Sequence, residues 1–68
     1  MNEVTWIGDD PLLRTAEVAP LLRCSPETLR VWRYRRQGPP YVKAGRQVLY
    51  RRSAVVQWLE DHTERAVG

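Results

Sequence analysis

Arginines in the middle of the chain are the side chains best suited to chemistry in this sequence. Residues 14–52 hold ten of the eleven cationic residues and only two acids, a balance of +8. Residues 1–13 carry a net charge of −3, and residues 53–68 carry −2. Nine of the ten central cations are arginine, whose planar guanidinium suits phosphate groups and guanine edges. This segregation favours a nucleic-acid partner over a solvated basic surface.

The segment "CSPETLRVWRYRR" predicts the helix that would present some of these arginines. Ser25 is a good N-cap and Pro26 stands at the favoured first helical position, while "GPP" predicts a helix end near Gln37. A helical period places Leu29 and Trp32 together on the core side.

The opposite face of this predicted helix holds Glu27, Val31 and Tyr34, flanked by Arg30 and Arg35. Such a face suits base edges, because an acid accepts from cytosine, a valine contacts a thymine methyl group and an arginine reaches guanine or phosphate. Glu27 has an equal alternative role, as a first-turn acid that stabilises the helix dipole.

The segment "PPYVKAGRQVLYRR", residues 39–52, predicts a small hairpin. "YVK" and "QVLY" have the composition of two short strands that turn at Ala44-Gly45. Val48 and Tyr50 would share the face that rests on the core. Lys43 and Arg46 would then lie on either side of a tip for which Gly45 supplies the permissive backbone. Cations so placed can follow a narrow minor groove by its potential.

Two further helices complete the predicted domain. The first begins with Thr15 as N-cap and runs to about Arg23, although Pro20 predicts a kink or a shortened start. The last is "AVVQWLEDHTERA", with Ser53 as its N-cap. Its predicted inner side carries Val55, Trp58, Leu59 and His62.

The order of elements is helix, tight turn, helix, hairpin, helix. It predicts a small α+β fold of the winged helix-turn-helix type, with three helices and a two-stranded wing between the second and the third. We expect a DNA-binding domain over residues 12–68 and an N-terminal arm over residues 1–11. Trp32 and Trp58 are predicted core residues. Trp6, with Val4 and Ile7 in the arm, either folds back on the core or docks on a partner.

Composition argues against several other classes of protein. A chain of 68 residues is short for a catalytic pocket, and one cysteine, Cys24, excludes an internal disulfide. Cys24 and the one histidine, His62, cannot furnish a four-ligand zinc site, so we expect no metal and no cofactor. Cys24 is expected as an apolar plug in the turn, and His62 as a partly buried helix residue. Without a signal peptide or a membrane span, the expected location is the cytoplasm.

The pattern resembles the excisionases of temperate phages, also called recombination directionality factors, within the MerR-like winged-helix proteins. "SPETLRVWR" and "PPYVKAGRQVLYRRSAV" carry the resemblance, which covers roughly residues 13–59. It implies a helix in the major groove, a wing in the adjacent minor groove, DNA bending, and cooperative binding to neighbouring sites beside the integrase in a bacterial host. No catalysis is implied. Val31 and Tyr34 depart from the arginines that related excisionases can carry, and Arg23 replaces a common corner glycine.

Carried over to this chain, the resemblance makes Glu27 the acidic base reader and adds Ser25 and Thr28 to the helix motif. The candidate recognition residues are therefore Ser25, Glu27, Thr28, Arg30, Val31, Tyr34 and Arg35, and the candidate wing residues are Lys43, Gly45 and Arg46. Two alternatives to an excisionase remain open. One is a small MerR-like transcription regulator or phage repressor, and the other is a protein-interaction module without a DNA role. Cooperative head-to-tail self-association on DNA is expected for the excisionase.

Overall fold

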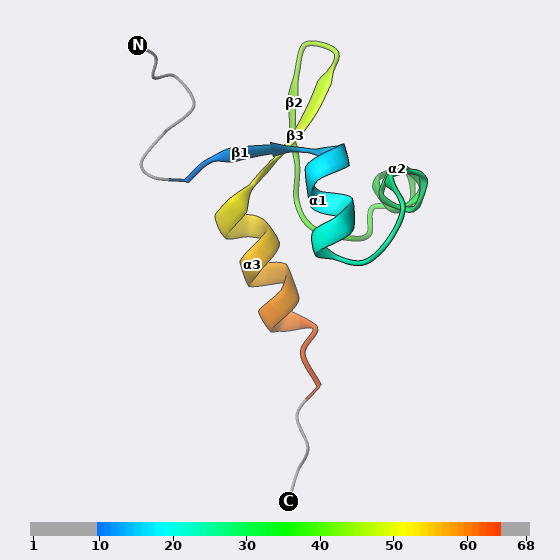
Figure 1. Ribbon diagram of the computed structural model, residues 1–68. Coiled ribbons are helices and arrows are strands. Elements are labelled where there is room, and N and C mark those ends of the chain that lie inside the picture. The colour runs from blue at the N-terminus through cyan, green and yellow to red at the C-terminus, as the bar shows by residue number, and fades with distance from the viewer. Residues whose placement is uncertain (1–9, 65–68) are drawn as a thin grey trace, which may run out of the picture.

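The computed structural model describes residues 10–64, which form three helices and one small antiparallel sheet (Figure 1). The elements are, in order, β1 (Leu12–Arg14), α1 (Thr15–Leu21), α2 (Pro26–Tyr34), β2 (Val42–Ala44), β3 (Gln47–Arg51) and α3 (Arg52–Asp61). The predicted small α+β fold of winged helix-turn-helix type is confirmed. Within residues 10–64, no helix has the length and apolar character that crossing a membrane requires. The predicted arm lies almost wholly outside the described residues, including Val4, Trp6 and Ile7.

The sheet has one more strand than the sequence predicts. β3 is central, with β1 on one side and β2 on the other, and both pairs are antiparallel. Leu13 of β1 lies opposite Tyr50 of β3. A three-residue strand has no alternation long enough to be recognised, and its partner is distant in sequence. β1 therefore exists because β3 offers it an edge.

The β2–β3 hairpin, or wing, turns one residue later than predicted. Ala44 lies opposite Gln47, which leaves Gly45 and Arg46 as a two-residue loop. Gly45 has a φ of +62°, in the left-handed region that favours glycine. An added Cβ would meet nothing within 4 Å, so backbone conformation rather than crowding explains this glycine.

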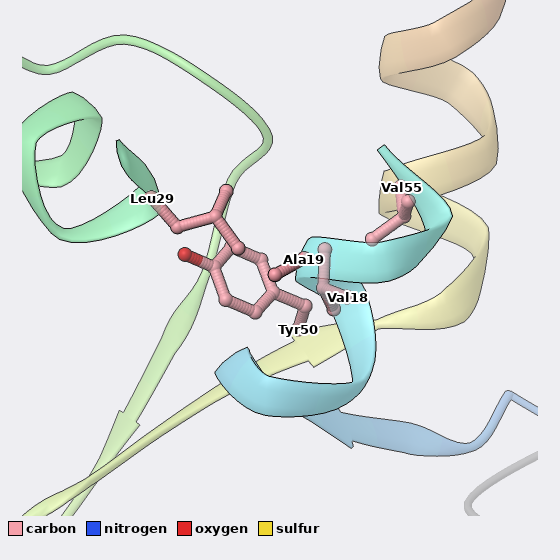
Figure 2. Close-up of a cluster of buried hydrophobic side chains, with 5 residues drawn as sticks. All are labelled: Val18, Ala19, Leu29, Tyr50 and Val55. Carbon is pink, nitrogen blue, oxygen red and sulfur yellow. The ribbon is translucent and has the colours of Figure 1, made fainter. Parts of the chain in front are cut away.

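The core is small and draws on all three helices and the central strand (Figure 2). α1 contributes Val18 and Ala19, α2 contributes Leu29, β3 contributes Tyr50, and α3 contributes Val55. Each of these side chains is at most 2% exposed. Because Tyr50 is the largest of them, the wing strand is fixed to the helices through one buried ring. On the predicted core face of β3, Tyr50 belongs to this cluster and Val48 is partly buried against it. Cys24, the predicted apolar plug, is also partly buried against the cluster.

The two tryptophans predicted as core residues, Trp32 and Trp58, are only half-buried. Trp32 packs at the edge of the core, and its ring centroid lies 5.5 Å from that of Trp58. His62, expected to be partly buried, is exposed and stacks on Trp58 at a centroid distance of 4.2 Å. Leu59, predicted on the same inner side, is exposed as well. These corrections have one cause. Val55 is the only buried residue of α3, which extends away from the sheet (Figure 1).

The predicted start of α2 is confirmed, whereas its predicted end and the predicted boundaries of the other two helices differ from the structure. The Ser25 hydroxyl accepts a hydrogen bond from the backbone N–H of Thr28 at 3.1 Å, and Pro26 is the first helical residue. α2 ends at Tyr34, before the predicted Gln37. Thr15 is not an N-cap but the first residue of α1. The helix begins before Pro20 without shortening and ends at Leu21, one residue after the proline. Its end, predicted near Arg23, is therefore the part that is shortened.

Ser53 does not cap α3, because the helix begins earlier, at Arg52. Asp10 instead supplies the acceptor at this helix end. Its carboxylate accepts hydrogen bonds from the backbone N–H of Ser53 at 2.8 Å and from the Ser53 hydroxyl at 2.7 Å. The N–H of Arg52 donates to the carbonyl of Pro11 at 3.0 Å. Asp10 and Pro11, which the sequence assigns to the arm, thus join β1 to the start of α3.

Candidate nucleic-acid interface

The outer face of α2 presents the side chains that the sequence singles out. Tyr34 is 89% exposed, Arg30 and Arg35 are exposed, and Val31 is half-buried. A tyrosine so open to solvent has no packing role in the described part of the chain. Thr28 is half-buried, and both Ser25 and Thr28 use their hydroxyls at the helix start, where their oxygens lie 3.0 Å apart. Those two residues order the N-terminus of the helix that carries the others.

Glu27 and Arg30 form an exposed ion pair one helical turn apart. The Arg30 Nη2 lies 2.6 Å from Glu27 Oε2, and Arg30 Nε donates to Oε1 at 3.2 Å. The hydrogen bond from Arg30 lowers the pKa of the Glu27 carboxyl, and the same contact raises the pKa of Arg30. The pair is therefore held in its charged form. It offers acceptor and donor groups side by side, which is the combination that base edges in a major groove match.

The wing places its two predicted cations differently. Arg46 is in the loop at the hairpin tip, where it is exposed. Lys43 lies further back in β2, opposite Val48, and faces a hollow beside α2. Arg46 alone is thus at the tip, while Lys43 lies between the tip and α2.

A cleft of about 650 Å³ separates α2 from the wing. We call it the helix–wing cleft, and its lining residues are Arg30, Arg33, Tyr34, Arg36, Tyr41, Lys43 and Val48. Four of these seven residues are cations and two are tyrosines, with no acid among them. Such a lining attracts an anion.

Arg33 is held in the helix–wing cleft by hydrogen bonds to two hydroxyl groups. Its Nη1 donates to the Tyr50 hydroxyl at 2.8 Å and, more weakly, to the Thr15 hydroxyl at 3.4 Å. The guanidinium carbon also lies 5.8 Å from the centre of the Tyr41 ring. Figure 2 shows the Tyr50 hydroxyl pointing toward α2, where Arg33 lies. A core tyrosine thereby orients a side chain at the surface.

Arg33 and Arg36 are absent from the residues proposed from sequence. Helical spacing alone puts Arg33 near the core side of α2, and Arg36 falls after the helix end. The local sequence does not show that the wing comes back against both. Charge was the available signal, because each belongs to the dense run "RVWRYRR".

A second hollow lies between the end of α2 and α3, away from the wing. Its volume is about 680 Å³, and its apolar wall is made by Trp32, Trp58 and the His62 ring. Arg36 and Asp61 also line it. We refer to it as the aromatic pocket. Gly38 also lines the pocket and lies directly against Trp32, because a Cβ at this position would lie only 2.8 Å from Trp32 Cε3.

Two helices joined by a tight turn and followed by a hairpin define a winged helix-turn-helix protein. A family model described as a helix-turn-helix domain matches residues 12–63, and the chain belongs to this family. Domains of this kind bind DNA and are typically not enzymes. A search of curated proteins and a search of solved structures each gave no match.

Proposed function

We propose that the protein is a recombination directionality factor, a phage excisionase that binds and bends DNA at adjacent attachment-region sites and directs integrase towards excision. One observation carries the proposal: the exposed face of α2 and the wing border a common cationic cleft. In this proposal α2 enters the major groove and the wing follows the adjacent minor groove. Bending lets one small domain engage both grooves.

Recognition is assigned to the helix face and positioning to the wing. Val31 and Tyr34 supply apolar contact, and the Glu27–Arg30 pair supplies hydrogen bonds to a base pair. Arg35 and Arg46 are assigned to phosphate or groove contacts. Val31 and Tyr34 stand where related excisionases can carry arginines, so the preferred DNA sequence is expected to differ from theirs.

The experiment is a recombination assay with the integrase encoded nearest to this gene. A plasmid that carries both prophage attachment sites is incubated with integrase, with and without the protein. We expect excision to require the protein, and a bend in each bound fragment by circular-permutation gel shift. Excision that proceeds equally well without the protein would contradict the proposal.

A small MerR-like transcription regulator or phage repressor is the second candidate. The observation in its favour is that the helical motif "SPETLRVWR" is shared with such regulators, and a helix-turn-helix domain serves both roles. The same DNA can decide between them. Altered transcription from a bound promoter, combined with no effect on excision, would favour the regulator.

A further inference from the structure

Arg23 and Arg36 share an uncommon backbone conformation at the ends of two different helices. Their φ angles are +57° and +59°, in the left-handed region. Side chains other than glycine adopt it at a cost, because the Cβ approaches the following carbonyl oxygen. Strain of this kind persists where the surrounding structure holds it, and it often accompanies function.

Both arginines stand where glycine is the usual residue. After α1, the N–H of Cys24 donates to the carbonyl of Ala19 at 3.0 Å, and that of Arg23 to Pro20 at 3.1 Å. After α2, the N–H of Gln37 donates to Trp32 at 2.7 Å. These bonds form a Schellman motif at each helix end, in which the left-handed residue is most often glycine. The backbone therefore supplies no reason for arginine at either position.

The two positions differ in what surrounds the side chain. Arg36 lines the helix–wing cleft together with Arg30, Arg33 and Lys43, whereas Arg23 is not among its lining residues. Arg33 is already held in place there by Tyr50. An anion in the cleft would meet Arg33 of α2, Arg36 of the segment that follows α2, and Lys43 of β2.

We propose that the helix–wing cleft binds one backbone phosphodiester of DNA, and that Arg36 is kept in a strained conformation because its charge is needed there. The inference rests on the proposed DNA-binding function and adds a defined anion site to it. A phosphate at this point lies where a DNA strand would pass from α2 to the wing. Its contacts would fix the angle between the two without reading sequence.

The test compares Arg36→Gly with Arg23→Gly, which make the same chemical change at the same backbone conformation. Each variant should melt at or above the wild-type temperature, because glycine relieves the strained backbone. Only Arg36→Gly should bind a short random-sequence duplex more weakly. It should also lower the slope of log affinity against log salt by about one unit. Arg36→Asn, which tolerates the same backbone, provides a second variant with the same expectation.

DNA in which one backbone linkage at a time is uncharged then locates the contact. On a sequence selected from a random pool, single phosphates are replaced by methylphosphonate. One replacement should weaken wild type and Arg23→Gly more than it weakens Arg36→Gly, which retains Arg33 and Lys43 in the cleft but has lost one of its cations. Equal losses of affinity in Arg36→Gly and Arg23→Gly would overturn the cleft assignment, because Arg23 does not line the cleft. A loss in Arg36→Gly that no replacement reproduces would also overturn it, and would direct attention to the aromatic pocket that Arg36 also borders. A wild-type protein without salt-dependent duplex binding would instead overturn the proposed DNA function itself.

Discussion

Glu27 has two possible roles that a single substitution can separate. In the proposed function its carboxylate, paired with Arg30, accepts a hydrogen bond from a base edge, and it also lies in the first turn of α2. We expect Glu27→Ala to relax preference at one base pair, by a factor on the order of 10 to 100. Binding of wild type and variant to DNA altered one position at a time gives the measurement.

The matched control for Glu27 is Glu17, the first-turn acid of α1. Its carboxylate accepts a hydrogen bond from the Arg14 N–H at 2.7 Å, so Glu17→Ala weakens a helix start without altering α2. We expect a lower melting temperature and unchanged base preference. The same pattern in Glu27→Ala would assign Glu27 to helix stability alone.

Individual residues of α2 were predictable where the helical period decides their position. Leu29 and Tyr34 lie buried and exposed as expected, because a capped helix fixes the direction of each side chain. The pairing of Glu27 with Arg30 follows from i, i+3 spacing, but no such rule brings Arg33 to Tyr50. That contact depends on where β3 packs relative to α2, which no local sequence pattern predicts.

The wing is the element whose charge is most easily tested. Lys43→Ala and Arg46→Ala should each weaken DNA binding and lower the salt slope by about one unit, because each removes an exposed cation. Folding should be unaffected, since neither side chain belongs to the core. Gln47→Ala, an exposed uncharged position beside Arg46, is the control and should retain the full slope. Unchanged affinity in both charge variants would remove the wing from the interface.

Elements with their own local signals were predicted from sequence, and elements that depend on distant partners were not. α2 has a cap, a proline and an abrupt stop, and the wing has its turn glycine. β1 and the start of α3 are defined by each other, through Asp10 and Pro11. Ser53 therefore served as a misleading cap signal, since its N–H binds the carboxylate of a residue 43 positions earlier.

The Asp10 contact makes the junction of β1 and α3 sensitive to acid. Hydrogen bonds from Ser53 lower the pKa of the Asp10 carboxyl below its ordinary value of 3.8. A carboxyl whose pKa is lower in the folded state contributes stability above its unfolded pKa and loses it as pH falls through the folded pKa. Asp10→Ala should thus lower the melting temperature at neutral pH, and the difference from wild type should vanish in strong acid.

Thermal melts of wild type and Asp10→Ala, from neutral pH down to strong acid, give the measurement. Ser53→Ala is the partial control, because it removes the hydroxyl bond and keeps the backbone bond to Asp10. We expect a smaller loss in that variant. A difference between Asp10→Ala and wild type that stays constant with pH would show that the carboxylate charge has no part in the junction.

At the scale of the whole molecule, charge is distributed along the chain as acidic, basic, acidic. Copies bound side by side on DNA could place an acidic end of one against the basic surface of the next. Such a contact is head to tail and, repeated along DNA, gives an open filament rather than a closed dimer. Asp10 is excluded from this role, because Ser53 of its own chain already occupies it.

The last prediction concerns residues 1–9, which carry Glu3 and Asp9 together with the apolar side chains of Val4, Trp6 and Ile7. Their deletion, with Asp10 kept so that α3 retains its acceptor, should reduce cooperativity between adjacent sites more than affinity for one site. Glu3→Gln with Asp9→Asn should reproduce the loss if charge makes the contact, and added salt should then weaken cooperativity in wild type. Serine at Val4, Trp6 and Ile7 should reproduce it instead if the contact is apolar. Isotherms on one site and on several adjacent sites decide the matter, and equal affinity per site in the wild-type protein would exclude the filament and favour the regulator.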